Sequence, residues 1–147
     1  MISYTIIVSG MVYFDMVEST VSKHAVINGT ILTMDRHWTT YDRGMIVIDG
    51  TTITEVGKYD PDRLDALGIP SSRRIDAAEG IIIPGLINTH THIGMSFFRS
   101  LADDQPDRLQ KVIFPLERSY VNPRVVYLSS LHSLTEMILG GTTCIAD

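Results

Sequence analysis

The chain has 147 residues, of which 44% are hydrophobic and 20% are charged, and its formal net charge is −5 at pH 7. This composition is typical of a soluble globular protein and excludes a disordered or fibrous chain. The acidic balance, without a cluster of lysine and arginine, argues against nucleic acid and an anionic membrane as partners and favours a small-molecule substrate.

Cysteine content and apolar runs indicate the compartment. Cys144 is the single cysteine, so an intramolecular disulfide is impossible and we expect a reducing, cytoplasmic setting. Cys144 itself is expected to be a small, buried apolar residue. The start, Met1 to Gly10, lacks the basic region and cleavage site of a signal peptide, and no run is long enough for a bilayer span.

The first predicted elements are antiparallel strands with alternating hydrophobicity. They cover residues 24–34, 44–49 and 52–56. Asp49-Gly50 predicts a tight hairpin between the last two, because glycine accepts the positive φ that such turns require. Residues 60–73 are predicted to be a connector with about one turn of helix at 62–67.

An apolar run at residues 80–87 leads into two histidines and predicts a buried strand entering a barrel. Alternate side chains of a strand share a face, so His90 and His92 can reach one metal ion together. An arbitrary pair of this spacing is more commonly two polar residues at a strand end. The spacing by itself therefore leaves both interpretations open.

Helical spacing follows the histidines. Met95, Phe98 and Leu101 can share one face. Met95, Phe97 and Phe98 are candidates for lining a pocket mouth beside the metal, although core packing is the commoner role. A polar loop is predicted at residues 103–107.

A second helix is predicted to begin at Asn122, with Pro123 at its first position, and to stop at Gly140-Gly141. Its apolar positions recur at three- and four-residue steps: Val125, Leu128, Leu131, Leu134 and Ile138. A buried strand at residues 142–146 follows. Strand, helices and strand in this order predict a βα unit and the next strand of a parallel sheet. A complete (β/α)₈ barrel needs about 250 residues, and only the last ~70 here could belong to one.

Five blocks of the chain together carry a family resemblance. They are residues 25–35, 84–92, 98–104, 115–117 and 136–147. In this order they resemble the amidohydrolase superfamily, in the branch of cytosine-deaminase-like enzymes, S-adenosylhomocysteine/methylthioadenosine deaminase-like enzymes and triazine chlorohydrolases. The resemblance covers residues 24–147 and leaves residues 1–23 as an extra N-terminal segment.

The resemblance implies an incomplete α/β fold. Residues 24–83 would be the N-terminal part of a composite β-sandwich, and residues 84–147 would be the first βαβ of a metal-dependent (β/α)₈ barrel. His90 and His92 would bind one divalent metal ion, zinc or alternatively iron. The third histidine ligand, the catalytic glutamate and histidine, and a late aspartate of the family have no match in this chain, so no catalytic residue is assigned.

Glu117 is the candidate substrate-binding residue. Pro115-Leu116-Glu117 matches a Pro-x-Glu motif of the deaminase branch, whose carboxylate receives ribose hydroxyls, and a carboxylate can accept two such hydrogen bonds. The alternative is a solvated loop glutamate paired with Arg118. Residues 103–112 lack the tryptophan often found there in the branch, which leaves the substrate open.

Two functions are consistent with the sequence. The first is the N-terminal fragment of a hydrolase that acts on C–N bonds, by hydrolytic deamination of a purine nucleoside-like or other N-heterocyclic substrate with metal-activated water. The isolated chain would then be inactive. The second is a noncatalytic interaction or oligomerisation module. In both cases we expect exposed apolar surface, and with it a homo-oligomer or association with the rest of the barrel.

Overall fold

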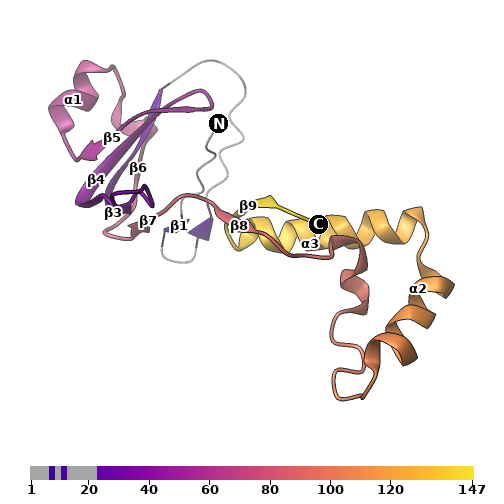
Figure 1. The fold of residues 1–147 in the computed structure, drawn as a ribbon. Helices are drawn as coiled ribbons and strands as arrows, with labels where there is room; N and C mark the ends of the chain where they lie inside the picture. Colours follow the sequence, from indigo (N-terminus) through magenta and orange to yellow (C-terminus); the bar gives the residue numbers. More distant parts are fainter. Residues whose placement is uncertain (1–6, 9–10, 13–22) are drawn as a thin grey trace. The chain divides into compact units, whose positions relative to one another are not determined.

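The computed structural model describes residues 7–8, 11–12 and 23–147 (Figure 1). The chain divides into two compact units, Met1–Leu86 and Ile87–Asp147. Of the expected extra segment 1–23, most lies outside the described residues. Its described part includes strands β1 (Ile7–Val8) and β2 (Met11–Val12), which pair antiparallel. The expected domain boundary between residues 83 and 84 stays a prediction.

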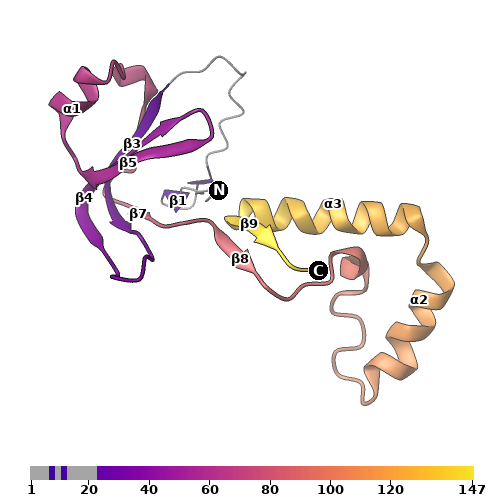
Figure 2. The ribbon, with the colours of Figure 1, turned by 45° about the horizontal axis from the view of Figure 1, so that its top comes forward.

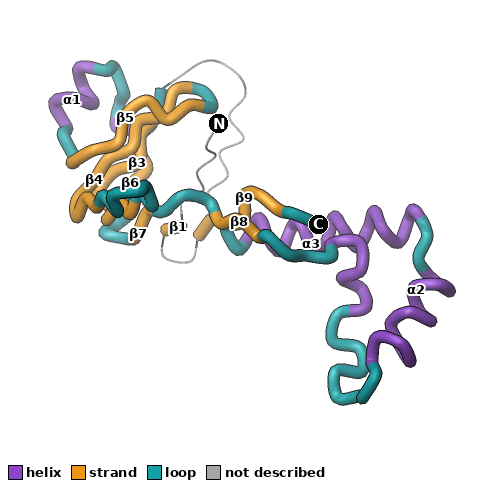
Figure 3. The backbone as a smooth tube through the Cα atoms, viewed as in Figure 1, coloured by secondary structure: helices purple, strands orange, loops and turns teal. Residues whose placement is uncertain are grey.

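The first unit is built on a mixed sheet, drawn in orange in Figure 3. Three antiparallel strands form its centre and edge: β3 (His24–Leu32), β4 (Thr40–Asp49) and β5 (Thr52–Lys58). Two short strands lie parallel to β3: β6 (Arg74–Asp76) and β7 (Ile81–Ile82). The three predicted antiparallel strands are confirmed, although β4 begins at Thr40 rather than at residue 44.

The predicted turn and connector of this unit are also confirmed. Asp49 pairs with Thr52, so a two-residue loop joins β4 to β5, and Gly50 adopts the required positive φ of 57°. Helix α1 (Pro61–Ala66) begins after Asp60, whose side chain accepts a hydrogen bond from the Arg63 amide. The 3₁₀ helix η1 (Ser71–Arg73) leads into β6.

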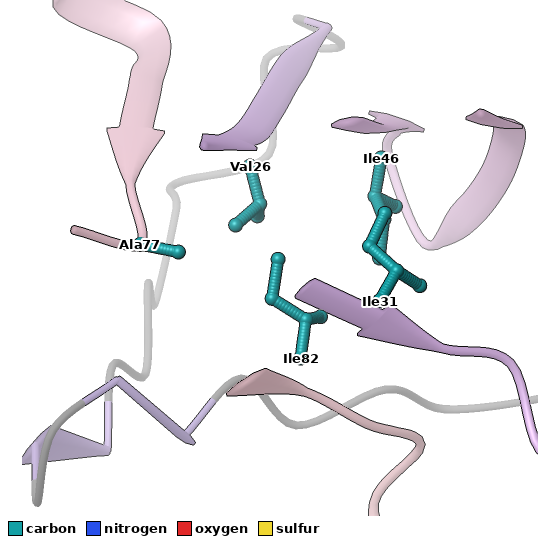
Figure 4. Packing of buried hydrophobic residues seen from close by; sticks show 5 residues of the cluster. All are labelled: Val26, Ile31, Ile46, Ala77 and Ile82. Atoms are coloured by element: carbon teal, nitrogen blue, oxygen red, sulfur yellow. The ribbon is translucent and has the colours of Figure 1, made fainter. Parts of the chain in front are cut away.

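Two buried clusters form the core of the first unit. Figure 4 shows the first of them, which consists of Val26, Ile31, Ile46, Ala77 and Ile82. The second consists of Ala25, Met45, Val47, Leu64 and Ile69. Neighbouring strand residues fall into different clusters because successive side chains point to opposite faces of a sheet. Helix α1 contributes Leu64 to the second cluster, so both faces of β3 and β4 are buried.

The expected single buried strand at residues 80–87 is wrong. The run is split into β7, which pairs with β3, and β8 (Leu86–Asn88), which pairs with β9 (Thr142–Ile145). Pro84 lies between them and has no N–H with which to continue a ladder. Ile82 is the one buried residue of this run, whereas Ile81 is 56% exposed and Ile87 is 67% exposed.

The second unit is mainly helical (Figure 2). It contains the 3₁₀ helix η2 (Ile93–Phe98), the π-helix η3 (Leu109–Ile113), α2 (Phe114–Tyr120) and α3 (Pro123–Leu139). The helical face expected through Leu101 is corrected, because η2 ends at Phe98. Ser100 and Ala102, with φ of 62° and 54°, take left-handed conformations that interrupt a right-handed helix. The polar segment 103–107 forms turns as predicted.

Helix α3 begins as predicted and buries a different face. The Asn122 side chain accepts hydrogen bonds from the amides of Arg124 and Val125. The buried positions, however, are Ser129 and Ser133, whereas Leu128 is 41% exposed and Leu131 is 52% exposed. The small serine side chains let η2 approach α3 closely. Hydrogen bonds also join the two elements: Ser129 Oγ donates to the Ile93 carbonyl, and Ser96 Oγ donates to the Ser129 carbonyl. A pattern of apolar residues does not predict that a helix buries its serines.

Candidate metal centre

His90 and His92 follow strand β8 and lie close together. Their Nε2 atoms are 3.3 Å apart, and the rings meet edge to face with centroids 5.2 Å apart. Two nitrogen ligands at about 2.0–2.1 Å from one tetrahedral zinc ion are separated by about 3.3–3.4 Å. Both side chains are exposed, so an ion from solvent can reach them. The separation of the two nitrogens therefore fits a shared metal ion.

Hydrogen bonds on both sides of the histidines fix the segment that carries them. The Asn88 carbonyl accepts from the Ala146 amide at 2.9 Å, and the Asn88 side chain accepts from the His90 amide at 3.2 Å. After the histidines, the Ile93 amide donates to the Asp147 carboxylate at 2.7 Å. The histidine pair is thus held at both ends through the β8–β9 pairing and the residues that follow β9.

A cleft of about 600 Å³ lies beside His92 within the second unit. Its apolar lining includes Met95 and Phe98, as the pocket-mouth interpretation of these residues predicted. Phe97 is exposed, and the centroid of its ring lies 6.2 Å from the centroid of the His132 ring. The cleft therefore combines one candidate metal ligand with an apolar wall.

The most strongly paired charges at the cleft are Arg99 and Glu136. Arg99 donates two hydrogen bonds to the Glu136 carboxylate, at 2.7 and 3.1 Å. These bonds and the positive charge of Arg99 hold the pKa of Glu136 below its usual 4.5 and raise the pKa of Arg99. Sequence reasoning missed this pair. Arg99 and Glu136 both lie in blocks that resemble the amidohydrolases, and this shared membership was the one feature of the sequence that could have singled them out.

The structure places Glu117 on helix α2, so the alternative of a solvated loop glutamate is wrong about the loop. Its side chain is half-buried, and Glu117 is not among the residues that line the cleft beside His92. Within the described part of the chain, no ion pair joins Glu117 to Arg118. Its role toward a ribose stays a prediction.

Among residues 23–147, no group of three or more histidine, cysteine, aspartate or glutamate side chains gathers where it could hold a metal ion. The candidate metal ligands in this part of the chain are therefore the two histidines alone. Cys144 is exposed, so its expected burial is wrong. It lies on β9, whose sheet has only two strands, and such a sheet leaves alternate side chains uncovered.

A family comparison covers the segment that contains the histidines. Residues 81–147 match the family model described as "Amidohydrolase family". These residues belong to the amidohydrolase family. We call residues 81–147 the amidohydrolase segment. It includes β8, both histidines, the cleft and β9.

Curated relatives of the amidohydrolase segment extend the similarity over most of the chain. The chain is 43% identical over 122 residues to a 5-methylthioadenosine/S-adenosylhomocysteine deaminase of Thermoanaerobacter pseudethanolicus, covering 82% of this chain and 27% of the relative. It is 38% identical over 122 residues to a 5'-deoxyadenosine deaminase of Methanosarcina mazei, covering 82% of this chain and 26% of the relative. The chain thus spans about a quarter of the length of these relatives.

Solved structures share the fold. An adenosine deaminase from Xanthomonas campestris with bound zinc superposes with a TM-score of 0.73 at 27% identity, covering 84% of this chain and 28% of that chain. An atrazine chlorohydrolase from Arthrobacter aurescens TC1, complexed with zinc, gives a TM-score of 0.68 at 28% identity and the same coverage, 84% and 28%. An amidohydrolase-type α/β fold with a mixed sheet is thereby confirmed. The composite sandwich and the incomplete barrel stay predictions.

Among the described residues, no helix is both long enough and apolar enough to cross a membrane.

Proposed function

We propose that the chain is the N-terminal part of a metal-dependent amidohydrolase that deaminates a purine nucleoside-like or other N-heterocyclic substrate by hydrolysis. The observation that carries this proposal is the 3.3 Å separation of the His90 and His92 Nε2 atoms within the amidohydrolase segment. The names of the curated relatives, which are deaminases of adenosine-type compounds, support the reaction class.

His90 and His92 would hold one divalent ion, with zinc as the proposed metal and iron as the alternative. Neutral imidazole nitrogens suit zinc, and the zinc-bound neighbours support this choice. When bound, the ion supplies a water molecule of lowered pKa. Catalytic zinc sites commonly have three protein ligands, so two histidines from this chain should bind metal weakly. We therefore propose that the 147-residue chain alone is inactive.

The remaining residues of the site would orient the substrate. Met95 and Phe98 offer apolar contact area for a flat ring beside His92, and binding pockets are typically lined in this way. Arg99 is held by Glu136 and is therefore kept from rotating freely into the cleft. Glu117 is proposed to accept ribose hydroxyls, as the deaminase motif implies.

Metal binding can be tested on the chain itself. Zn²⁺ titrated into the 147-residue chain, followed by calorimetry and by the NMR signals of the histidine rings, should bind at one site per chain. His90→Ala and His92→Ala should each abolish this binding, because a single imidazole remains. His132→Ala, on the exposed side of α3, is the matched control and should bind as the unaltered chain does. Equal binding by all four proteins would contradict the proposal.

The reaction needs a longer protein. The DNA that follows the Asp147 codon shows whether the reading frame continues. If it does, the zinc-loaded full-length protein should release ammonia from 5'-methylthioadenosine, S-adenosylhomocysteine or 5'-deoxyadenosine. A full-length protein that binds zinc and releases no ammonia from these compounds, from guanine or from triazines would contradict the proposed deamination.

A noncatalytic interaction module is the second candidate function, and exposed apolar side chains on α3 favour it. Leu128 and Leu131 lie on the same helix with much of their surface in solvent. We propose that a second copy of the chain or the remainder of a barrel covers them. Sedimentation should show association at micromolar concentration that Leu131→Glu reduces. A monodisperse, thermally stable monomer would contradict this expectation.

A further inference from the structure

Both peptide groups of Ile93, the residue directly after His92, are held by side chains from distant parts of the amidohydrolase segment. The Ile93 amide donates to Asp147 Oδ1 at 2.7 Å. The Ile93 carbonyl accepts from Ser129 Oγ at 2.9 Å and from Ser133 Oγ at 3.4 Å. We call Asp147, Ser129 and Ser133 the Ile93 clamp.

The hydroxyl groups of Ser129 and Ser133 make hydrogen bonds in addition to allowing close packing of α3 against η2. Ser129 is fully buried and Ser133 is 6% exposed, and they stand one helical turn apart on the face of α3 that packs against η2. Alanine would permit the same close packing but could not donate to the Ile93 carbonyl. Ser129 Oγ also lies 2.8 Å from Ser96 Oγ on η2. The hydroxyls therefore provide directional contacts at this point of the fold.

The Asp147 carboxylate accepts the hydrogen bond of the Ile93 amide. Ile93 is the first residue of η2, and the first N–H groups of a helix have no acceptor within it. The N–H belongs to the His92–Ile93 peptide plane, so its hydrogen bond to Asp147 restricts ψ of His92. The carbonyl belongs to the next peptide plane, which the serines restrict. Two consecutive peptide planes after the second histidine are thus fixed in orientation.

We propose that Asp147, Ser129 and Ser133 are positioning residues that hold His92 at the separation from His90 that a shared metal ion requires. The inference rests on the proposed metal-binding function of the two histidines. Residues outside the ligand set that orient metal ligands commonly change metal affinity by about 10–100-fold when mutated. Because the Ile93 clamp acts through the backbone, we expect effects near the lower end, about tenfold.

The test compares Zn²⁺ affinity and amide exchange in matched variants of the 147-residue chain. Asp147→Ala should weaken Zn²⁺ binding about tenfold and accelerate hydrogen exchange of the Ile93 amide. Asp147→Asn should leave both near their original values, because the amide oxygen still accepts the Ile93 hydrogen bond. Ser129→Ala should weaken Zn²⁺ binding, whereas Ser130→Ala, the neighbouring serine of α3, should not.

The possible outcomes separate the clamp from the proposed function. If His90→Ala abolishes Zn²⁺ binding while Asp147→Ala and Ser129→Ala bind normally, the clamp is overturned and the metal site stands. If Asp147→Asn binds as weakly as Asp147→Ala, Asp147 acts through its charge and positioning by the hydrogen bond is overturned. Binding that survives His90→Ala would overturn the metal site, and the clamp's role with it.

The fold of each variant is checked by circular dichroism and amide NMR spectra. Should Asp147→Ala unfold the second unit, Ser129→Ala and Ser133→Ala provide the same comparison from α3. Unchanged Zn²⁺ affinity in both folded serine variants would then overturn the clamp. Weaker binding in both, with a native-like spectrum, would support it.

Discussion

The guanidinium of Arg99 meets the carboxylate of Glu136 through two parallel hydrogen bonds of 2.7 and 3.1 Å. Arg99 follows η2 directly, and Glu136 lies in the last turn of α3. The pair therefore ties the segment after the histidines to α3 at a point separate from the Ile93 clamp. Both side chains are about half exposed, so water and salt weaken their attraction.

The pH dependence of the second unit should reflect this pair. The pKa of Glu136 in the folded chain is below 4.5 because of Arg99, so the stabilisation is present at neutral pH and is lost as the pH falls through the folded value. Arg99→Ala should lower the melting temperature slightly at pH 7, and the difference should vanish in acid. In an NMR titration of this variant, the pKa of Glu136 should rise toward 4.5.

An internal control is available in the first unit. The hydrogen bond from the Thr39 amide is the largest cause that lowers the pKa of Asp35, and this contact does not involve Arg99. The pKa of Asp35 should therefore stay low in Arg99→Ala. A Glu136 carboxylate that titrates at its usual value in the unaltered chain would contradict the pairing.

Two neighbouring isoleucines of β7 should differ sharply in their effect on stability. Ile82 is 1% exposed within the first core cluster (Figure 4). Ile81, in contrast, is 56% exposed. Ile82→Ala should cost about 2–5 kcal/mol in the free energy of unfolding, because it removes buried methyl groups and leaves a cavity. Ile81→Ala should cost much less. Denaturant unfolding of the two variants measures both values, and equal losses would contradict the described packing.

Gly29 of β3 should not tolerate a side chain. A Cβ there would lie 2.7 Å from Cδ1 of Ile82 and 2.9 Å from Cβ of Ala77, and both of these residues are buried. Gly29→Ala should therefore destabilise the first unit by about 1–3 kcal/mol through overpacking.

Gly57 of β5 is the matched control for this substitution. A Cβ at Gly57 would meet no atom within 4 Å, so Gly57→Ala should be neutral or slightly stabilising. Thermal unfolding monitored by circular dichroism distinguishes the two variants. A Gly29→Ala chain as stable as the Gly57→Ala chain would show that the strand can shift to make room.

The start of α3 depends on the side chain of Asn122. Its oxygen accepts from the amides of Arg124 and Val125, both at 3.1 Å. Asn122→Ala should cost about 1 kcal/mol, because two amides at the helix start lose their acceptor. Asn122→Asp should retain most of the stability. Urea unfolding of the second unit is the measurement, and identical midpoints for Ala and Asp would contradict the capping role.

Local features were predictable because they depend on neighbouring residues. The alternating strands of the first unit, the Gly50 turn and the Asn122 cap each need only a few adjacent positions, and all were predicted. The spacing of His90 and His92 likewise predicted that both side chains can reach one metal ion, and the 3.3 Å separation of their Nε2 atoms agrees with it. The Arg99–Glu136 pair was not predicted from the residues, since 37 positions separate its members.

The sequence by itself determined the strand and helix periods, the turn and cap residues, and the placement of two histidines on alternate positions. Tertiary structure decided which of these features meet. It divided the run around Pro84 between two sheets, buried Ser129 and Ser133 in α3 while leaving Leu128 and Leu131 exposed, and brought Asp147 to Ile93. These outcomes depend on contacts between elements far apart in the chain. A periodic pattern shows that a helix has an apolar face, but the shape and polarity of the opposing element decide which face is buried.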